Sequence, residues 1–373
     1  MTRPAGTLDR SLPAARALVE SSIGRVCSCA VLHVRLSGDI VCEAAFGEVA
    51  PGGAVAGNDA IFDLASLTKI AVGTALLVLL DQRRFALDDP IVATFPEFAG
   101  RDARRAMVTF RHLLTHTSGL PPSVNARAES SAARVIERVC ATPLTNAPGE
   151  RVVYSDCGFI LAGEAVARLS GVPLPIALQS LVFDPLAIAS CGYVPQGAIL
   201  DRTVVTERDE WRGRLLRGEV HDETCWSMGG VAGHAGLFGA AADVGRLSEL
   251  YRQAGQYAGR RVLSRATSQS AVKEHARSHD ERRGLAWALK SSNARPWGRS
   301  LSPNTYGHTG YTGTSLIVDP KRALTVVLLT NRVYVTREPG PIADLRAAVH
   351  DAVIAELEPL RPMERSSLLD RHP

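Results

Sequence analysis

The order of strand-like and helical segments constrains the fold of this 373-residue chain more than any other feature of its sequence. Near both ends, short runs of β-branched and apolar residues are typical of strands, and Ser37-Gly38 separates the first two as a hairpin turn. The expected strands cover residues 27–36, 39–46, 284–289, 314–318 and 324–330. Because both ends supply strands, we expect them to pair in one antiparallel sheet.

The long stretch between these strands has a mainly helical pattern. The expected helices cover residues 70–80, 131–140, 158–170 and 241–251, with terminal helices from about residue 8 and over 342–358. We therefore expect an α/β (α+β) fold with two domains. In this prediction, residues 1–62 and 275–373 form a sheet domain flanked by the terminal helices. Residues 63–274 form a mainly helical domain, and the active site lies in the cleft between the two.

Ser66-Leu67-Thr68-Lys69 supplies a nucleophile and a base one helical turn apart, directly before the apolar run 70–80. Ser66 is therefore expected near a helix N-terminus, with Lys69 on the same face. A serine hydroxyl becomes a strong nucleophile only when a neighbour takes its proton, and lysine can do so only when it is neutral. We expect Ser66 to be the nucleophile and Lys69, held largely neutral, to be its base.

The same Ser-x-x-Lys spacing occurs again at Ser270 and Lys273, although the chain has only four lysines. That second copy lacks a helix-start pattern, whereas Ser66 is followed by two polar motifs further along the chain. The first is Tyr154-Ser155-Asp156, which precedes an expected helix. A phenol near a lysine can carry protons between a nucleophile and a leaving group, so we expect Tyr154 to assist Lys69.

The second motif is His308-Thr309-Gly310, which lies before the expected strand 314–318. A glycine in such a segment lets a ligand approach the backbone closely. The following N–H group, on Tyr311, is then expected to join the N–H of Ser66 as an oxyanion hole.

These three motifs, in this order, resemble those of β-lactamases and penicillin-binding proteins. Within that superfamily, the chain resembles the class C β-lactamase-like branch, with its D-alanyl-D-alanine carboxypeptidase and family VIII carboxylesterase relatives. Further matches lie at residues 111–120, 233–238 and 329–332, and the resemblance covers roughly residues 15–358. It implies a β-lactamase/transpeptidase-like fold, and it implies substrate-binding roles for Asp156, His308, Thr309, Gly310 and His234.

Two residues depart from the class C pattern. Asp156 stands where these enzymes usually have asparagine, and His308 stands where they usually have lysine. A histidine is only partly charged near neutral pH, which weakens recognition of a substrate carboxylate. Both departures argue against a dedicated β-lactamase.

We therefore expect a serine hydrolase that forms an acyl-enzyme, with carboxylesterase-like activity on small acyl esters. Three alternatives remain open at this stage: a β-lactamase or D-amino-acid peptidase, an acyltransferase in small-molecule biosynthesis, and a non-catalytic binding protein on the same scaffold. The fold does not choose among them. The expected partner is a small-molecule ester or amide.

Several other classes of protein are not indicated. There is no G-x-S-x-G elbow and no nucleotide-binding fingerprint, so we expect no cofactor. His112 and His116 lack the glutamate of a zinc motif, so we expect structural roles for them and no metal site. The scattered arginines and the short apolar run 70–80 indicate neither nucleic-acid nor membrane binding. Seven cysteines without a C-x-x-C pair, and no apparent signal peptide, favour a cytoplasmic location.

Overall fold

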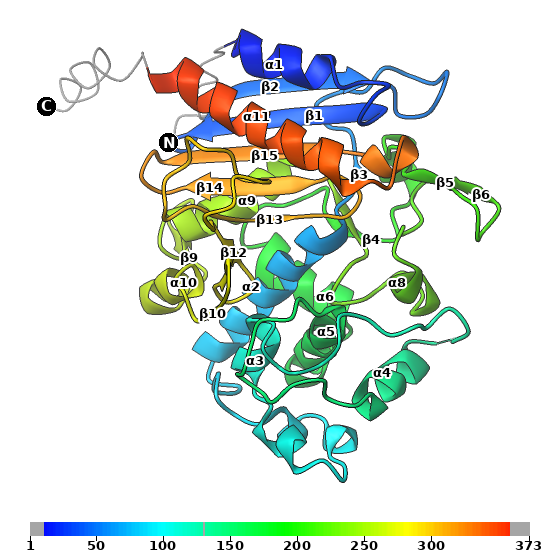
Figure 1. Cartoon of the computed structure of the whole chain (residues 1–373), viewed down its shortest axis with the longest axis vertical. Helices are drawn as coiled ribbons and strands as arrows, with labels where there is room; N and C mark the ends of the chain where they lie inside the picture. Colours follow the sequence, from blue (N-terminus) through cyan, green and yellow to red (C-terminus); the bar gives the residue numbers. More distant parts are fainter. Residues whose placement is uncertain (1–10, 130, 359–373) are drawn as a thin grey trace, which may run out of the picture.

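Strands from both ends of the chain pair in one antiparallel sheet (Figure 1). The structure is a computed structural model and describes residues 11–129 and 131–358. Within this part of the chain, the largest sheet has eight strands in the order β10-β11-β12-β13-β14-β15-β1-β2. These strands are β1 (Cys29–Leu36), β2 (Asp39–Gly47), β10 (Ala276–Ser278), β11 (Glu281–Arg283), β12 (Ala288–Leu289), β13 (Tyr306–Thr309), β14 (Ser315–Asp319) and β15 (Leu324–Thr330). The predicted α/β fold with an antiparallel sheet is confirmed.

The first hairpin and the pairing at the centre of the sheet follow from the sequence. Ser37 and Gly38 both adopt left-handed backbone conformations, with φ of 55° and 99°, as a two-residue hairpin turn requires. β1 then pairs with β15, where Val31 lies opposite Leu329. Most residues of both strands are buried, because other elements cover both faces of the sheet.

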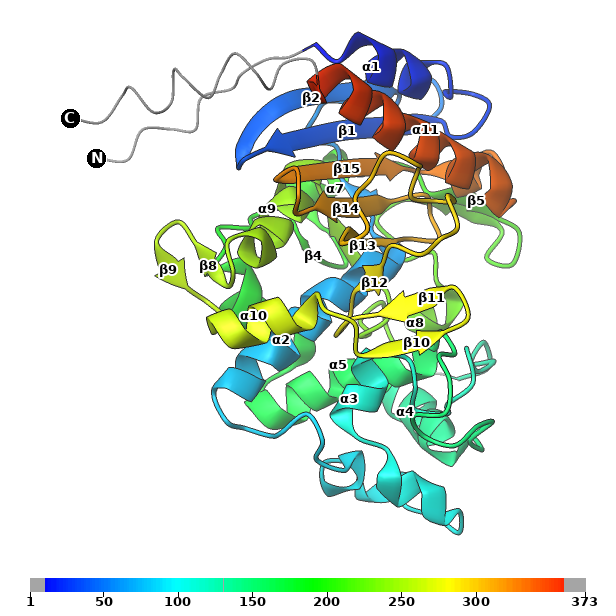
Figure 2. The same cartoon turned by 60° about the vertical axis from the view of Figure 1, so that its left-hand side comes forward.

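Helices form the layers on either side of this sheet. α1 (Pro13–Glu20) and α11 (Pro339–Leu357) pack against each other on one face, as Figures 1 and 2 show. α9 (Ala241–Arg252) contacts β1, β14 and β15 and joins the buried cluster on the opposite face. Because α9 belongs to residues 63–274, the structure differs here from the predicted domain boundary: a helix expected in the helical domain packs on the sheet.

The helical lobe is built around α2 (Thr68–Asp81), which is apolar on all sides. Every residue from Thr68 to Leu79 is buried, as expected for a helix that other elements surround. α2 packs against α5 (Asp156–Ser170) and α6 (Leu174–Leu178), and α5 in turn contacts α3 (Phe110–Leu114) and α4 (Ala132–Ala141). Among the described residues, no single helix is both long and apolar enough to cross a membrane, although α5 and residues 174–183 meet that criterion together as a pair bent by 77°.

Smaller elements link the sheet to the lobe, and some of the strands were not predicted. The linking elements are β3 (Phe62–Asp63), β4 (Gly192–Tyr193), β5 (Glu207–Asp209), β6 (Arg214–Leu216), β7 (Leu237–Gly239), β8 (Gln256–Tyr257), β9 (Arg260–Arg261), α7 (Gly197–Asp201), α8 (Glu223–Ser227) and α10 (Arg265–Ala271). The sequence did not predict β10, β11 or β13, and of the expected strand 284–289 only β12 forms. These strands are short and carry charged residues or glycine instead of alternating apolar side chains, so periodicity does not reveal them. The start of the expected N-terminal helix, at residue 8, lies outside the described residues.

One close approach between backbones joins α5 to the glycine-rich segment that carries His234. A Cβ atom added to Gly163 would lie 2.6 Å from the Cα atom of Gly233 and 2.7 Å from its nitrogen. Only glycine fits at this contact, because neither backbone can yield without moving its own element. The contact sets the distance between α5 and the segment around His234.

We therefore expect Gly163→Ala to lower the free energy of unfolding by about 1–3 kcal/mol through overpacking. Gly158→Ala is a matched control on the same helix, because its added Cβ would meet only ordinary contacts at 3.7–3.9 Å. The control should be neutral or slightly stabilising, since alanine favours helix over glycine. Urea unfolding of both variants checks this, and equal midpoints for Gly163→Ala and the wild type would contradict it.

Candidate active site

Ser66 lies in a short, conformationally strained turn directly before α2. The turn is a single 3₁₀ segment, Ala65–Leu67, and Ala65 adopts a left-handed conformation with φ of 47°. Asp63 holds this turn from within: its Oδ1 accepts the N–H of Ala65 at 2.8 Å, and its Oδ2 accepts the N–H of His221 at 2.7 Å. The expectation that Ser66 starts a helix is therefore met, with the turn fixed by a buried carboxylate.

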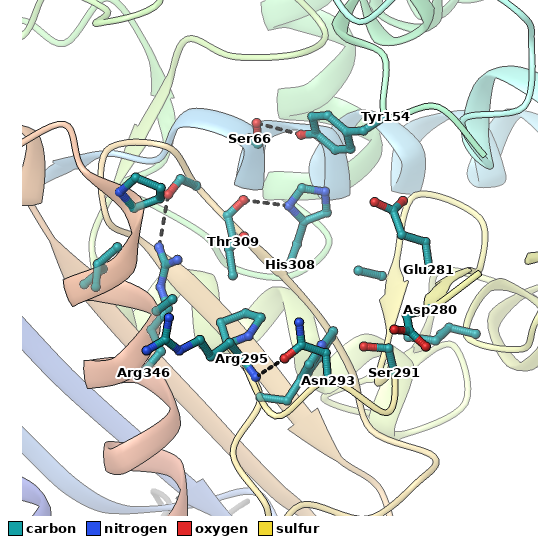
Figure 3. A pocket seen from close by; sticks show the side chains of 18 of the residues that line it. Ser66, Tyr154, Asp280, Glu281, Ser291, Asn293, Arg295, His308, Thr309 and Arg346 are labelled. Atoms are coloured by element: carbon teal, nitrogen blue, oxygen red, sulfur yellow. Dashed lines mark hydrogen bonds between the residues drawn. The ribbon is translucent and has the colours of Figure 1, made fainter. Parts of the chain in front are cut away.

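The Ser66 hydroxyl lies between the two side chains that the motifs predicted. Lys69 Nζ donates to Ser66 Oγ at 2.8 Å. The Tyr154 hydroxyl lies 2.8 Å from the same oxygen, a contact that Figure 3 shows. Ser66 is half-buried, and it lines a cavity of about 570 Å³ together with Tyr154. The structure thus brings the serine, the lysine and the phenol into direct contact.

Lys69 is fully buried and is held by an ion pair. Its Nζ lies 2.7 Å from Asp156 Oδ1 and donates to the backbone oxygen of His234 at 3.0 Å. Burial would lower the pKa of Lys69, but Asp156 and Tyr154 outweigh burial, and the pKa is raised above its ordinary value of 10.5. The prediction that Lys69 is largely neutral is therefore wrong, because the sequence did not show that Asp156 is its partner.

Aromatic and cationic side chains fix the ring of Tyr154. The His116 ring lies 4.4 Å from it, and the Arg283 guanidinium lies 5.3 Å from its centroid. Burial, together with Arg283 and Lys69, holds the pKa of His116 well below 6.5, so this ring is neutral. Its Nδ1 accepts the N–H of Ser155 at 3.0 Å. His116 thus packs against the Tyr154 ring and binds the backbone of the tyrosine motif. The spacing of His112 and His116 in the sequence did not reveal this role.

The backbone after β13 lies against the Ser66 turn. Thr312 Oγ1 donates to the backbone oxygen of Asp63 at 2.7 Å, and Thr314 Oγ1 donates to that of Leu64 at 3.0 Å. A Cβ atom on Gly310 would lie 2.7 Å from the Leu64 oxygen, so glycine is required for this approach.

The same approach brings the two expected oxyanion-hole donors onto neighbouring backbones. Within the part of the chain that the structure describes, neither the Ser66 N–H nor the Tyr311 N–H has a hydrogen-bond partner. Two free donors beside a nucleophile are what an oxyanion hole needs.

His308 is buried on β13 and faces the same cavity as Ser66 (Figure 3). Its Nδ1 donates to the backbone oxygen of Thr309 at 2.9 Å, which leaves Nε2 as an acceptor without a protein partner among the described residues. Burial, aided by Lys69 and Arg283, lowers the pKa of His308 to about 3. The expectation that its charge varies around neutral pH is therefore wrong: His308 is a neutral acceptor.

The five residues predicted to bind substrate divide into two groups. His308, Thr309 and Gly310 line the cavity. Asp156 and His234 are not among its lining residues, because Asp156 pairs with Lys69 and the His234 ring points to Asp222, with Nε2 2.8 Å from Oδ1. Both residues contact Lys69 in this structure, and their predicted role in substrate binding stays a prediction.

Five arginines line the cavity, at positions 282, 283, 295, 332 and 346, and two of them bind the backbone after β13. Arg346, on α11, donates to the backbone oxygens of Gly310 at 3.1 Å and Thr314 at 2.7 Å, and burial lowers its pKa to about 9. Arg332 donates through Nε to the backbone oxygen of Tyr311 at 2.9 Å. Both arginines hold the backbone after β13 in place and add positive charge to one end of the cavity.

The remaining sequence candidates lie elsewhere. Ser270 is in α10, where its hydroxyl lies 3.1 Å from His275 Nε2, and it does not reach the cavity. Burial raises the pKa of the Cys157 thiol to about 12, so this thiol is unreactive. Among the described residues, no cluster of three or more His, Cys, Asp or Glu side chains has a geometry suited to a metal ion.

Comparisons with known proteins place the chain among serine enzymes of one fold. Residues 15–351 match the family model described as Beta-lactamase. The chain is 32% identical over 316 residues to the "Putative D-alanyl-D-alanine carboxypeptidase" of Escherichia coli K12, covering 76% of this chain and 70% of that protein. It is also 32% identical over 358 residues to the N-acetylmuramyl-L-alanine amidase of Bacillus subtilis 168, covering 85% and 80%.

Solved structures show the same fold at lower identity. EstCE1, a hydrolase with promiscuous acyltransferase activity, superposes with a TM-score of 0.75 at 20% identity, covering 91% of this chain and 97% of that one. A class C β-lactamase from Rhodobacter sphaeroides superposes with a TM-score of 0.73 at 19% identity, covering 92% and 99%. These similarities support the fold.

The buried environment of His308 predicts that its imidazole ring does not change its protonation state near neutral pH. We expect its ring signal in a two-dimensional NMR titration to show no inflection between about pH 5 and 8. Its folded-state pKa of about 3 lies below the ordinary 6.5, so its contribution to stability is present above pH 6.5 and is lost as the pH falls toward 3. His308→Gln should lessen this acid destabilisation. An inflection near pH 6.5 would show that the ring is accessible to protons and contradict the assignment.

Proposed function

The chain belongs to the beta-lactamase family of serine hydrolases, and from that premise we propose that it is a carboxylesterase-like enzyme acting on small, uncharged acyl esters. The observation that carries the proposal is the contact of one hydroxyl with two proton-handling groups: Ser66 Oγ lies 2.8 Å from both Lys69 Nζ and the Tyr154 hydroxyl. The neutral His308 then favours an uncharged substrate over an anionic one.

The first half of the reaction forms an ester on Ser66. In the proposed reacting form Tyr154 is the phenolate and accepts the Ser66 proton. Lys69 Nζ lies 4.9 Å and the Arg283 guanidinium 5.3 Å from the centroid of its ring. Ser66 Oγ bonds to the substrate carbonyl carbon while the N–H groups of Ser66 and Tyr311 bind the developing oxyanion. Tyr154 then returns the proton to the leaving alkoxide as the ester C–O bond breaks. Lys69 stays protonated throughout and stabilises the negative charge beside it.

The second half releases the acyl group. Tyr154, again as the phenolate, takes a proton from a water molecule, whose oxygen attacks the acyl carbon. Ser66 Oγ leaves as the tetrahedral intermediate collapses, and it recovers its proton from Tyr154. An alcohol in place of water would give acyl transfer by the same steps.

The walls of the cavity support a small acyl substrate with apolar character. Leu289, Trp297 and Ile342 line it, and all three are buried. His308 Nε2 offers a neutral acceptor close to Tyr154, whose ring centroid lies 6.0 Å away. A substrate that carries an N–H or O–H group near its ester is therefore favoured over one that carries a carboxylate.

A second candidate function rests on Arg332 and Arg346. Both line the cavity, and among the described residues neither forms an ion pair with a carboxylate. A guanidinium near the reacting centre favours a substrate carboxylate, as in a β-lactam or a D-alanyl-D-alanine peptide. The carboxypeptidase named among the relatives makes this the principal alternative.

The nucleophile is tested by covalent labelling. A fluorophosphonate should add one adduct to the wild type, and peptide mapping should place it on Ser66. Ser66→Ala should take up none while keeping its melting temperature. Ser270→Ala is the matched control, because Ser270 has the same Ser-x-x-Lys spacing and does not line the cavity. An adduct on Ser270, or no adduct on the wild type, would overturn the assignment, and the latter result would favour a non-catalytic binding protein.

Substrate choice is tested by the ratio of kcat/KM for p-nitrophenyl butyrate to kcat/KM for an anionic cephalosporin. We expect the wild type to favour the neutral ester by about tenfold or more, because an unpaired carboxylate beside neutral His308 loses a charge-assisted hydrogen bond. Arg346→Met should change this ratio little. A wild type that prefers the cephalosporin, with the preference lost in Arg346→Met, would establish the second candidate instead.

A further inference from the structure

A second cavity, of about 550 Å³, lies beside the active site and has no role in the steps described above. Its wall includes the hairpin of β5 and β6, which projects from the body of the protein in Figure 1, and the first turn of α8. We infer that this cavity is a saccharide subsite, in which Trp211 stacks against a neutral sugar ring of the substrate.

The second cavity is connected to the active site through a short series of contacts. The Tyr311 ring, which lines the first cavity, lies 5.5 Å from the His221 ring. His221 Nε2 lies 2.6 Å from Glu207 Oε2, and Glu207 accepts two hydrogen bonds from Arg337, at 2.7 and 2.8 Å. Glu207 and Arg337 line the second cavity. Tyr311 and His221 therefore separate two neighbouring cavities, and in the inferred binding mode one extended ligand occupies both.

Trp211 supplies an exposed aromatic surface at the rim of the second cavity. Its side chain is 40% exposed, and that of Trp226, 5.2 Å away in an edge-to-face arrangement, is 36% exposed. Arg212 fixes the pair: its guanidinium lies 5.4 Å from the Trp211 ring and 5.3 Å from the Trp226 ring. It is itself held by the backbone oxygens of Val220 at 2.7 Å and His221 at 3.0 Å. The exposed part of the Trp211 ring, held in place by Arg212, is suited to pack against a flat, partly apolar ligand.

The charges of the second cavity argue for a neutral ligand. Three arginines and three glutamates line it, so they balance. Glu207 pairs with Arg337, and Glu223 pairs with Arg127, whose guanidinium also lies 5.3 Å from the Trp211 ring. These paired groups still offer lone pairs and N–H groups to hydroxyls, and a charged ligand that bound to either pair would have to disrupt it. Arg208 and Glu210, which form no ion pair among the described residues, add opposite charges that cancel. Hydroxyl groups around a ring whose CH face packs on tryptophan are the chemistry of a sugar.

The saccharide subsite adds detail to the substrate of the proposed function. Only the assignment of both cavities to one substrate rests on that function. The saccharide would form the part of the ester or amide remote from the scissile bond. Binding in the second cavity needs no turnover, so it can be measured in Ser66→Ala. A loss of binding and a loss of acyl-enzyme formation are therefore separate results.

The test is saturation-transfer-difference NMR on the Ser66→Ala protein with neutral saccharides. The panel consists of glucose, N-acetylglucosamine, xylose, galactose and the β-1,4-linked dimers cellobiose and N,N′-diacetylchitobiose, with hexanoate and glucuronate as anionic probes. We expect saturation transfer to at least one neutral saccharide, with little change at high salt because the ligand carries no charge. Trp211→Ala should weaken its binding roughly tenfold or more, and Trp211→Phe should weaken it less.

Leu215→Ala is the matched control, because Leu215 is 39% exposed on the same hairpin and does not line the cavity. It should leave saccharide binding unchanged, and circular dichroism should show that the Trp211 variants keep their fold. The inference is overturned if no member of the neutral panel binds, if only the anionic probes bind, or if Trp211→Ala binds the saccharide as tightly as its parent.

Discussion

The ion pair between Lys69 and Asp156 is the interaction on which the rest of the active site depends. A lysine without solvent contact costs several kcal/mol unless its charge is paired and its N–H groups are bonded. Three groups surround the Lys69 ammonium: Ser66 Oγ, three residues away, and, from distant parts of the chain, Asp156 on the first turn of α5 and the backbone oxygen of His234. Three separate elements must therefore converge before the site can form, and the contact of Gly163 with Gly233 permits that convergence.

The ion pair between Lys69 and Asp156 also determines, in the proposed mechanism, which neighbour of Ser66 carries its proton. In the proposed mechanism Asp156 keeps Lys69 protonated, so the proton of Ser66 travels through Tyr154. The cation then acts as a fixed charge beside the developing negative oxygen atoms, which costs no reorganisation during the reaction. His308, in turn, is neutral partly because Lys69 and Arg283 already supply positive charge nearby. The neutral state of His308 thus follows first from its own burial and then from the nearby lysine, and in the proposed function it favours uncharged substrates.

The sequence predicted the framework of this site well and its internal pairing poorly. The Ser66 motif, the strand Leu324–Thr330 and the helix around residues 241–251 could be read from spacing and periodicity, because these signals are local. The partners of Lys69 could not, since spacing does not show which way the side chains of Asp156 and His234 turn. Arg346 was not predicted as a site residue, because it reaches the Gly310 backbone from a helix more than 30 residues away in sequence. Strand β13 was missed because it is short and contains glycine.

The most direct test of this account is the protonation state of Lys69. The chain has only four lysines, so lysine labelled with ¹³C at Cε gives few signals, and Lys69→Met identifies the one that belongs to Lys69. The account predicts that this signal stays that of a charged ammonium through neutral pH and titrates only above the ordinary value of 10.5. A titration of the Lys69 signal near neutral pH would contradict it, and would return the role of general base from Tyr154 to the lysine.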